Sequence, residues 1–239
     1  SHTLIIYVRI VKIDMKRIIL SIMMVTATIV TAFAQEEKPA STQPTSAEIS
    51  ALRTASSLAK YGYANYSATA LIEAANIFSS IKTQELEANM TPGSNDPIKA
   101  KDNNISFDPQ QLLADAKTYA GNDKTILDLI KKTEQSLAQT STRGAVGGPK
   151  GGVYAVRAKA TDSFEIKFWS NELAEVCVSG DGDTDLDLYV YDEKGNLIGS
   201  DTDYSDDCVV RWVPAWTGKF IIKVVNRGML YNEYALWTN

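Results

Sequence analysis

The chain has 239 residues, enough for one or two domains, and its 29 acidic and 24 basic residues give a net charge of −5. An acidic chain of this kind is unsuited to binding nucleic acid through its overall field. The single histidine, His2, lies in a segment that we expect to be removed. The mature protein would then lack an imidazole for a catalytic triad, a general base or a zinc site, so the composition argues against an enzyme.

The first 34 residues have the pattern of an export signal. Met15-Lys16-Arg17 precedes an apolar run over residues 18–32, which ends in Ala32-Phe33-Ala34. This order predicts a secretory signal peptide cut after Ala34, with residues 1–14 as an upstream extension of the reading frame. A membrane anchor is the alternative, but the run is short for a span. Because residues 1–34 carry a net charge of +3, their removal would leave −8. We expect a periplasmic or extracellular protein without a membrane span.

Helical periodicity dominates the first half of the mature chain. Residues 35–45 are rich in Pro, Ser, Thr and Gln, which predicts a disordered leader. Residues 46–140 then carry four amphipathic patterns with capping residues, separated in the middle by a loop over Met90–Ser106. They predict a small helical bundle or two stacked hairpins. The expected ends are a capping box at Thr45 to Glu48, a stop at Gly62, a helix over Ser67–Lys82, a start at Asp108-Pro109, a stop at Gly121 and a cap at Asn122 or Asp123.

The second half changes to a period of two. Residues 141–152 are rich in glycine and predict a linker or a close backbone contact between domains. Residues 153–239 then hold eight short strand patterns with turns between them, which favours an antiparallel β-sandwich. The predicted fold class is therefore α+β in two domains. The expected strands are 153–159, 163–169, 174–179, 185–191, 196–200, 208–213, 219–226 and 231–237.

Two cysteines, Cys177 and Cys208, lie in strand-like segments. In an oxidising compartment an even pair usually forms a disulfide. The bond would close a loop of roughly thirty residues and stabilise the fold by about 3 kcal/mol. The alternative is two buried free thiols.

Nine aspartates lie between residues 181 and 207. Calcium binds six to eight hard oxygens, which loops of alternating aspartate and glycine can supply. The Asp-x-Asp-x-Asp run is not an EF-hand, because Leu186 stands where the turn needs glycine. The alternative is a solvated acidic rim that keeps sheet edges apart. The candidate calcium ligands are Asp181, Asp183, Asp185, Asp187, Asp201 and Asp203.

Three segments of the second half resemble the bacterial pre-peptidase C-terminal domain. They are the Asp-Leu-Asp-Leu strand at 185–192, the glycine-containing hairpin at 195–198, and Pro214–Gly218 with the strand that follows it. The resemblance covers about Val153 to Asn239. It implies a jelly-roll-like sandwich that serves as an accessory module on secreted proteins, and relatives in secreted collagenases bind calcium. The helical half resembles no family that we can name.

These observations predict a non-catalytic binding or structural module of the bacterial envelope, with calcium as a possible cofactor and an envelope glycan or protein as its partner. A carbohydrate-binding module is one alternative, with the turn residue Trp216 as the candidate stacking platform. A second alternative is a protein partner that binds the helices. An enzyme would have to use paired carboxylates, as glycosidases do.

Overall fold

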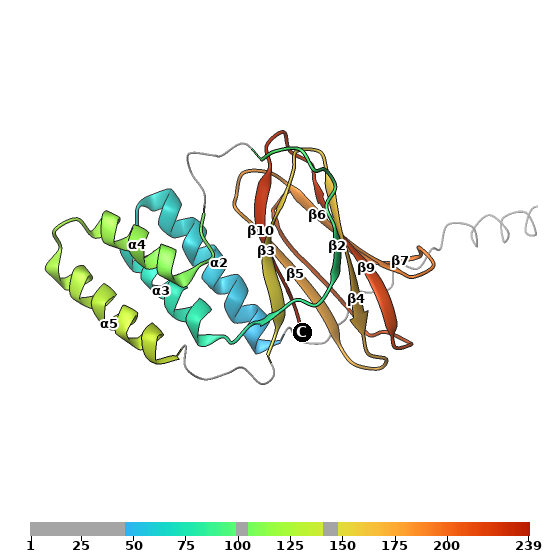
Figure 1. The fold of residues 1–239 in the computed structure, drawn as a ribbon, viewed down its shortest axis with the longest axis horizontal. Helices are drawn as coiled ribbons and strands as arrows, with labels where there is room; N and C mark the ends of the chain where they lie inside the picture. Colours follow the sequence, from blue (N-terminus) through green and yellow to red (C-terminus); the bar gives the residue numbers. More distant parts are fainter. Residues whose placement is uncertain (1–45, 99–104, 141–147) are drawn as a thin grey trace, which may run out of the picture. The chain divides into compact units, whose positions relative to one another are not determined.

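The computed structural model describes residues 46–98, 105–140 and 148–239. The expected signal peptide, the upstream extension, the leader and most of the glycine-rich linker lie outside the described residues. Figure 1 shows helices α2 to α5 beside a stack of two β-sheets, so the predicted α+β class is confirmed. No helix in the described ranges is both long and apolar enough to span a bilayer.

Asp108 caps its helix as predicted, whereas the first helix is capped by Ser46, one residue after the Thr45 that begins the predicted capping box. The Ser46 hydroxyl accepts from the Ile49 amide, and the Asp108 carboxylate accepts from two amides of the first turn. The expected stop at Gly62 is wrong, because the helix continues past it. A side chain at Gly62 would clash with Leu71, so this glycine allows two helices to pack closely. The helices are α2 (Ala47–Asn65), α3 (Ala68–Ser80), α4 (Pro109–Ala120) and α5 (Lys124–Thr140).

All eight predicted strands are present, in two five-stranded sheets. Sheet A has the order β1-β3-β10-β5-β8 and sheet B has the order β2-β4-β9-β6-β7. Sheet A contains β1 (Gln84–Glu85), β3 (Lys150–Val156), β10 (Asn232–Thr238), β5 (Ala174–Gly180) and β8 (Asp207–Trp212). Sheet B contains β2 (Asn89–Thr91), β4 (Thr161–Phe168), β9 (Gly218–Asn226), β6 (Leu186–Asp192) and β7 (Leu197–Asp201).

Two short strands come from the segment between the helix pairs. Strand β1 pairs in parallel with β3, and β2 pairs antiparallel with β4. The sequence pattern instead predicts that this segment belongs to the helical domain, with a loop over Met90–Ser106. The expected boundary at the linker also moves, because Gly151 and Gly152 belong to β3. Gly151 lies so close to Trp237 that a side chain there would clash with the indole ring.

Alternate residues of the strands fill the space between the sheets. Phe164, Ile166 and Phe168 point inward from β4, while the residues between them are exposed or half-buried. The same alternation on β6 and β9 buries aliphatic and aromatic side chains from sheet B. This core is the one that the period-two pattern predicts.

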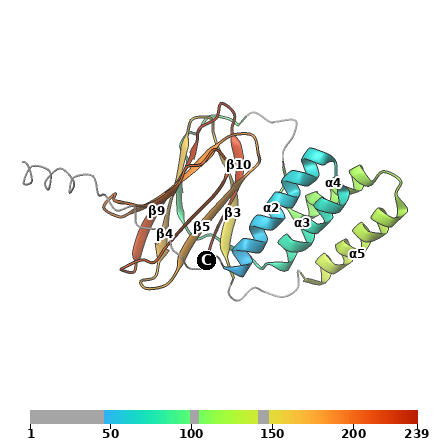
Figure 2. The ribbon, with the colours of Figure 1, turned by 180° about the vertical axis from the view of Figure 1, so that it is seen from behind.

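A second core lies between the helices and the outer face of sheet A. It joins apolar side chains of the four helices to Cys177, Ala235 and Trp237 of β5 and β10. Figures 1 and 2 show β3, β5 and β10 on the side of the helices and β4 and β9 on the far side. Every residue of β5 is buried, because this strand is covered on both faces. None of the described helices covers the outer face of sheet B, which we therefore call the open face of the sandwich.

The predicted disulfide between Cys177 and Cys208 is wrong, because both cysteines are free and fully buried. In the ladder between β5 and β8, Cys177 is opposite Val209 and Cys208 is opposite Val178. The offset of one residue puts the two thiols on opposite faces of sheet A. Cys177 packs in the helix-facing core and Cys208 packs in the sandwich core, so the sheet itself separates them.

We expect neither thiol to react with a thiol reagent in the folded protein at mildly alkaline pH. Burial raises the pKa of Cys177 to about 12 and raises the pKa of Cys208 as well, which suppresses the thiolate. Titration with a chromogenic disulfide should detect two thiols per chain after denaturation and none before it. Loss of both thiols from the denatured, unreduced protein would contradict this arrangement.

Candidate functional site

Three of the six predicted calcium ligands hold the backbone of the acidic loops. The Asp181 carboxylate is buried and accepts hydrogen bonds from the amides of Asp183 (3.2 Å) and Glu233 (2.7 Å). Asp201 accepts from the Val209 amide at 2.9 Å, and Asp203 accepts from the amide and hydroxyl of Ser205. These contacts join the loops to β10 and β8, so the three carboxylates fix loop conformation.

Asp187 lies apart from these residues, on the outer face of sheet B. Its carboxylate pairs with the Arg227 guanidinium at 2.5 Å and accepts a hydrogen bond from the Tyr189 hydroxyl at 3.1 Å. The same hydroxyl accepts from Arg227 at 3.0 Å. The three side chains therefore form a closed hydrogen-bonded triangle.

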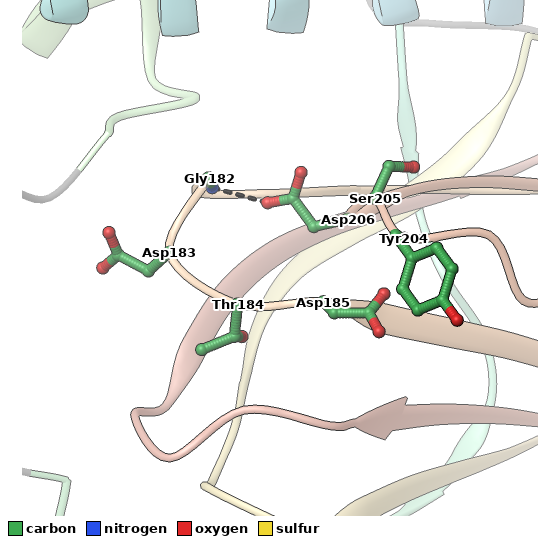
Figure 3. A pocket seen from close by; sticks show the side chains of 7 residues that line it. All are labelled: Gly182, Asp183, Thr184, Asp185, Tyr204, Ser205 and Asp206. Carbon is green, nitrogen blue, oxygen red and sulfur yellow. Dashed lines mark hydrogen bonds between the residues drawn. The ribbon is translucent and has the colours of Figure 1, made fainter.

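The remaining two candidates, Asp183 and Asp185, line an open pocket of about 220 Å³. Figure 3 shows it between the loop that follows β5 and the loop that precedes β8. The other lining side chains include Asp206, whose carboxylate accepts from the Gly182 amide, and the fully exposed Tyr204. One Asp185 oxygen is buried and has no hydrogen-bond partner among the described residues. Burial and the nearby Asp187 charge raise the pKa of this carboxyl.

Two further aspartates of the acidic run form ion pairs with a helix. The Lys60 ammonium lies 2.8 Å from carboxylate oxygens of both Asp206 and Asp207. Asp207 also accepts a hydrogen bond from the Ser179 hydroxyl. The interpretation of the whole run as a solvated rim is thus incorrect for these two residues, because a helix supplies their counter-ion.

The six predicted ligands do not come together in one place. Among the residues described, no group of three or more His, Cys, Asp and Glu side chains is close enough to hold a metal ion. Asp181, Asp187 and Asp201 are each engaged elsewhere, while Asp183 and Asp185 share the pocket. Calcium binding at this set stays a prediction.

Trp216, the predicted stacking residue, covers one end of the sandwich core. Its ring lies nearly parallel to Phe220, with an interplanar angle of 21° and centroids 5.7 Å apart. It also lies against Gly218, and 40% of the residue is exposed. This packing is typical of a residue that closes a core from solvent.

A surface that the sequence analysis did not identify lies on the open face of sheet B. We call it the tyrosine face, and it centres on Tyr189 and Tyr191 of β6. Their rings are nearly parallel, with an interplanar angle of 22° and centroids 6.3 Å apart. The Lys223 ammonium lies 5.0 Å from the centre of the Tyr191 ring. The available signal was the position of both tyrosines opposite in parity to Leu186, Leu188 and Val190.

The register of sheet B shows what surrounds the two rings. Tyr191 is opposite Ile221 on β9 and Leu197 on β7, and Tyr189 is opposite Lys223 and Ser200. Leu197 is 55% exposed, whereas the tyrosines are partly covered. The hydrogen bonds with Asp187 and Arg227 fix the Tyr189 hydroxyl. The face thus combines aromatic and aliphatic surface with oriented polar groups, which is the composition of a ligand-binding surface.

Comparisons with known proteins describe the β-region alone. No protein-family model and no curated protein matches this chain. The C-terminal β-region resembles the pre-peptidase C-terminal domain of a collagenase from Bacillus anthracis, as the sequence predicted. The identity is 13% over 37% of this chain and 89% of that chain, with a TM-score of 0.32.

Two further solved structures match this chain with comparable sequence identity, coverage and TM-score. The Yersinia pseudotuberculosis-derived mitogen is 13% identical over 39% of this chain and 86% of its own, with a TM-score of 0.31. PliG of Aeromonas hydrophila, a periplasmic inhibitor of g-type lysozyme, is 14% identical over 41% of this chain and 91% of its own, with a TM-score of 0.32.

Proposed function

We propose that this protein is an exported, non-catalytic binding module that binds a glycan on the tyrosine face of sheet B. The observation that carries the proposal is the pair of nearly parallel rings of Tyr189 and Tyr191 on an open sheet face. The pattern from Met15 to Ala34 supports export. A glycan is favoured because it offers both apolar C–H surface and hydroxyl groups.

The chemistry of the face fits such a ligand in two ways. Tyrosine rings present a large apolar surface at low entropic cost, and their hydroxyls remain available for hydrogen bonds. The face is also preorganised, because Asp187 and Arg227 hold the Tyr189 hydroxyl in one orientation. A ligand would therefore immobilise few side chains when it binds.

Within the described ranges, two thiols and the Asp185 carboxyl are poorly placed to act as catalytic groups. Both thiols are fully buried, and burial raises the pKa of each of them. The Asp185 carboxyl has a raised pKa, but its pocket is open and its neighbours are also acidic. These facts favour binding without catalysis.

Replacement of Tyr191 by alanine should weaken glycan binding by about tenfold or more, as expected when one stacking ring is lost. Affinity electrophoresis of the full chain in gels containing plant, bacterial and animal polysaccharides would measure the change. Tyr204→Ala is the matched control, since Tyr204 is fully exposed and lies in the acidic pocket, off the tyrosine face. Equal retardation of Tyr191→Ala and the unmodified protein in every gel would count against the proposed surface.

Trp216→Ala separates this proposal from the earlier candidate platform. Because Trp216 packs against Phe220, its loss should lower the melting temperature and leave glycan affinity unchanged. Loss of binding in Trp216→Ala with full binding in Tyr191→Ala would move the site to the end of the sandwich.

Calcium is proposed only as a stabilising ion of the acidic loops. The support is the run of aspartates in the sequence and the pocket that Asp183 and Asp185 line, where one buried Asp185 oxygen has no hydrogen-bond partner among the described residues. Calorimetric melts with added calcium and with a chelator provide the test. A transition at the same temperature in both conditions would rule out a structural ion.

A second candidate function, a protein partner on the helices, has one specific observation in its favour. Tyr61 and Tyr66 are 58% and 75% exposed, and Tyr66 packs edge-on against Tyr119 at 5.3 Å. Exposed tyrosines are common at protein interfaces. A crosslinking comparison of the full chain with Tyr66→Ala would test it; the helices alone are unsuitable because their core includes Trp237.

A further inference from the structure

Cationic side chains form a row along β9, beside the two tyrosines. The outward positions of this strand are Lys219, Ile221, Lys223 and Val225, and Arg227 follows at the same parity. At about 3.3 Å per residue, successive cations are about 13 Å apart. Every second outward position, counted from Lys219, therefore carries a positive group, and this row lies next to Tyr189 and Tyr191 on β6.

The Arg227 guanidinium is exposed on the tyrosine face, whereas the Asp187 carboxylate with which it pairs is buried. The Asp187 side chain is only 7% exposed, whereas the Arg227 side chain is 50% exposed. Hydrogen bonding to Asp187 raises the pKa of Arg227, so the guanidinium remains charged. It keeps exposed donors for an acceptor beyond Asp187 and the Tyr189 hydroxyl, because a guanidinium has five N–H groups.

The lysines nearest the rings are not neutralised by acids. Lys223 lies over Tyr191, and Lys167, opposite Lys219 in the ladder, lies 4.6 Å from the centre of the Trp169 ring. Within the described ranges, neither lysine forms an ion pair with a carboxylate. Lys219 does pair with Glu165, at 3.1 Å, and both side chains are exposed. We count the charged side chains that point outward from the described strands β4, β6 and β9, together with Arg227. There are four cations and two carboxylates, namely Lys167, Lys219, Lys223 and Arg227 against Glu165 and Asp187.

We propose that the ligand of the tyrosine face is an anionic glycan, a polysaccharide that carries carboxylate or sulfate groups along its length. This inference rests on the proposed function and specifies the class of glycan. A local positive surface on a protein with a net charge of −5 indicates charge complementarity with an anionic partner. A polymer could place its acidic groups beside Lys219, Lys223 and Arg227 while its rings contact Tyr189 and Tyr191.

Two other anionic partners fit the face less well. A nucleic acid would bring its dense phosphate charge close to the acidic loops, which repel it. An anionic membrane would need apolar side chains that protrude into the lipid. Of the apolar residues of this face, Ile221 and Val225 lie half-buried between charged neighbours, and the exposed Leu197 lies on the edge strand β7. A glycan uses both the rings and the cations.

The test compares two forms of one polymer, polygalacturonate and its methyl ester, which differ mainly in charge. Isothermal titration of the full chain should show binding to the acid form at least about tenfold tighter than to the ester, weakening as salt is added. Lys223→Gln should reduce that preference about fivefold with an unchanged melting temperature. Lys131→Gln, at an exposed position of α5, is the matched control and should bind like the unmodified protein.

The outcomes separate this inference from the proposed function. Equal affinity for the acid and the ester, abolished by Tyr191→Ala, would overturn the anionic class and leave glycan binding intact. Binding to neither form would count against both proposals. Tighter binding to phosphatidylglycerol vesicles or to polyglutamate than to polygalacturonate would replace the glycan by a membrane or an acidic peptide.

Discussion

Replacement of Trp237 by alanine should destabilise the helices and the sandwich together, by about 3 to 5 kcal/mol. Trp237 belongs to β10 and is 5% exposed, although it lies on the outer face of sheet A. Its ring packs against Phe78 of α3 and against Phe107, which precedes α4, with centroids 6.1 and 6.4 Å away. Removing the indole would leave a cavity where the helical layer meets the sheet.

Melting curves of the full chain would measure this effect. Far-ultraviolet circular dichroism follows the helices and near-ultraviolet dichroism follows the tertiary packing of the sandwich. Since one core joins both parts, we expect a single transition, lowered by roughly 10 °C in Trp237→Ala. Trp169→Ala is the matched control, because Trp169 is 58% exposed, and its melting temperature should change little.

Separate melting of the helices and the sandwich would contradict this prediction. If the helical signal were lost at a lower temperature while the sandwich melted as before, the two parts would be independent domains. That was the expectation from sequence, which placed a linker over residues 141–152 between them.

The strands of this protein were predictable because their pattern is local. Phe164, Ile166 and Phe168 alternate with polar residues, so burial of one face determines which residues point inward. Strand β1 has only two residues, Gln84 and Glu85, and its place is set by pairing with Lys150 and Gly151. No periodicity marks so short a strand, and the sequence therefore could not predict it.

The packing of helices on sheet A is reflected in the sequences of β5 and β10. Strands covered on both faces are expected to be apolar at successive positions, without alternation. Val176, Cys177 and Val178 in β5 show this, as do Tyr234 to Trp237 in β10. This run of buried residues also explains why the predicted disulfide was wrong. Successive buried residues of a strand point to opposite faces of the sheet, and here each face belongs to a different core.

The candidate site was predicted only in part, because side-chain partners are set by distant residues. The aspartate run suggested a common ligand, but Lys60 of α2 pairs with Asp206, and Arg227 pairs with Asp187. The alternation at 186–191 correctly predicted which residues of β6 face outward. It could not show that Lys223 would lie over Tyr191, since this contact depends on the pairing of β6 with β9.

Stability should fall steeply at alkaline pH, and the two buried thiols should cause the first part of the fall. Burial raises the pKa of Cys177 to about 12 and also raises the pKa of Cys208. In the unfolded chain both thiols ionise near their ordinary pKa of about 8.5. Above that pH the unfolded state binds fewer protons than the folded state, so the free energy of unfolding decreases as pH rises.

Each thiol contributes a slope of about 1.4 kcal/mol per pH unit once the unfolded form is ionised. From about pH 9 to about pH 11 the two together would remove about 5 kcal/mol, which is a large part of the stability of an ordinary domain. Buried tyrosines should add to the loss above about pH 10, where unfolded tyrosine ionises. Burial raises the pKa of Tyr234, whose hydroxyl donates to Asp162 at 2.9 Å.

Urea unfolding of the full chain at intervals from neutral to strongly alkaline pH would measure these slopes. The double variant Cys177→Ala with Cys208→Ala should lose a constant amount of stability to its two small cavities and show a much flatter decline between about pH 9 and about pH 10. Tyr61→Phe is the control, because Tyr61 is 58% exposed and should leave the slope as it was. An equally steep decline in the double variant would show that other groups cause the alkaline loss, and that the thiols ionise as readily in the folded chain as in the unfolded one.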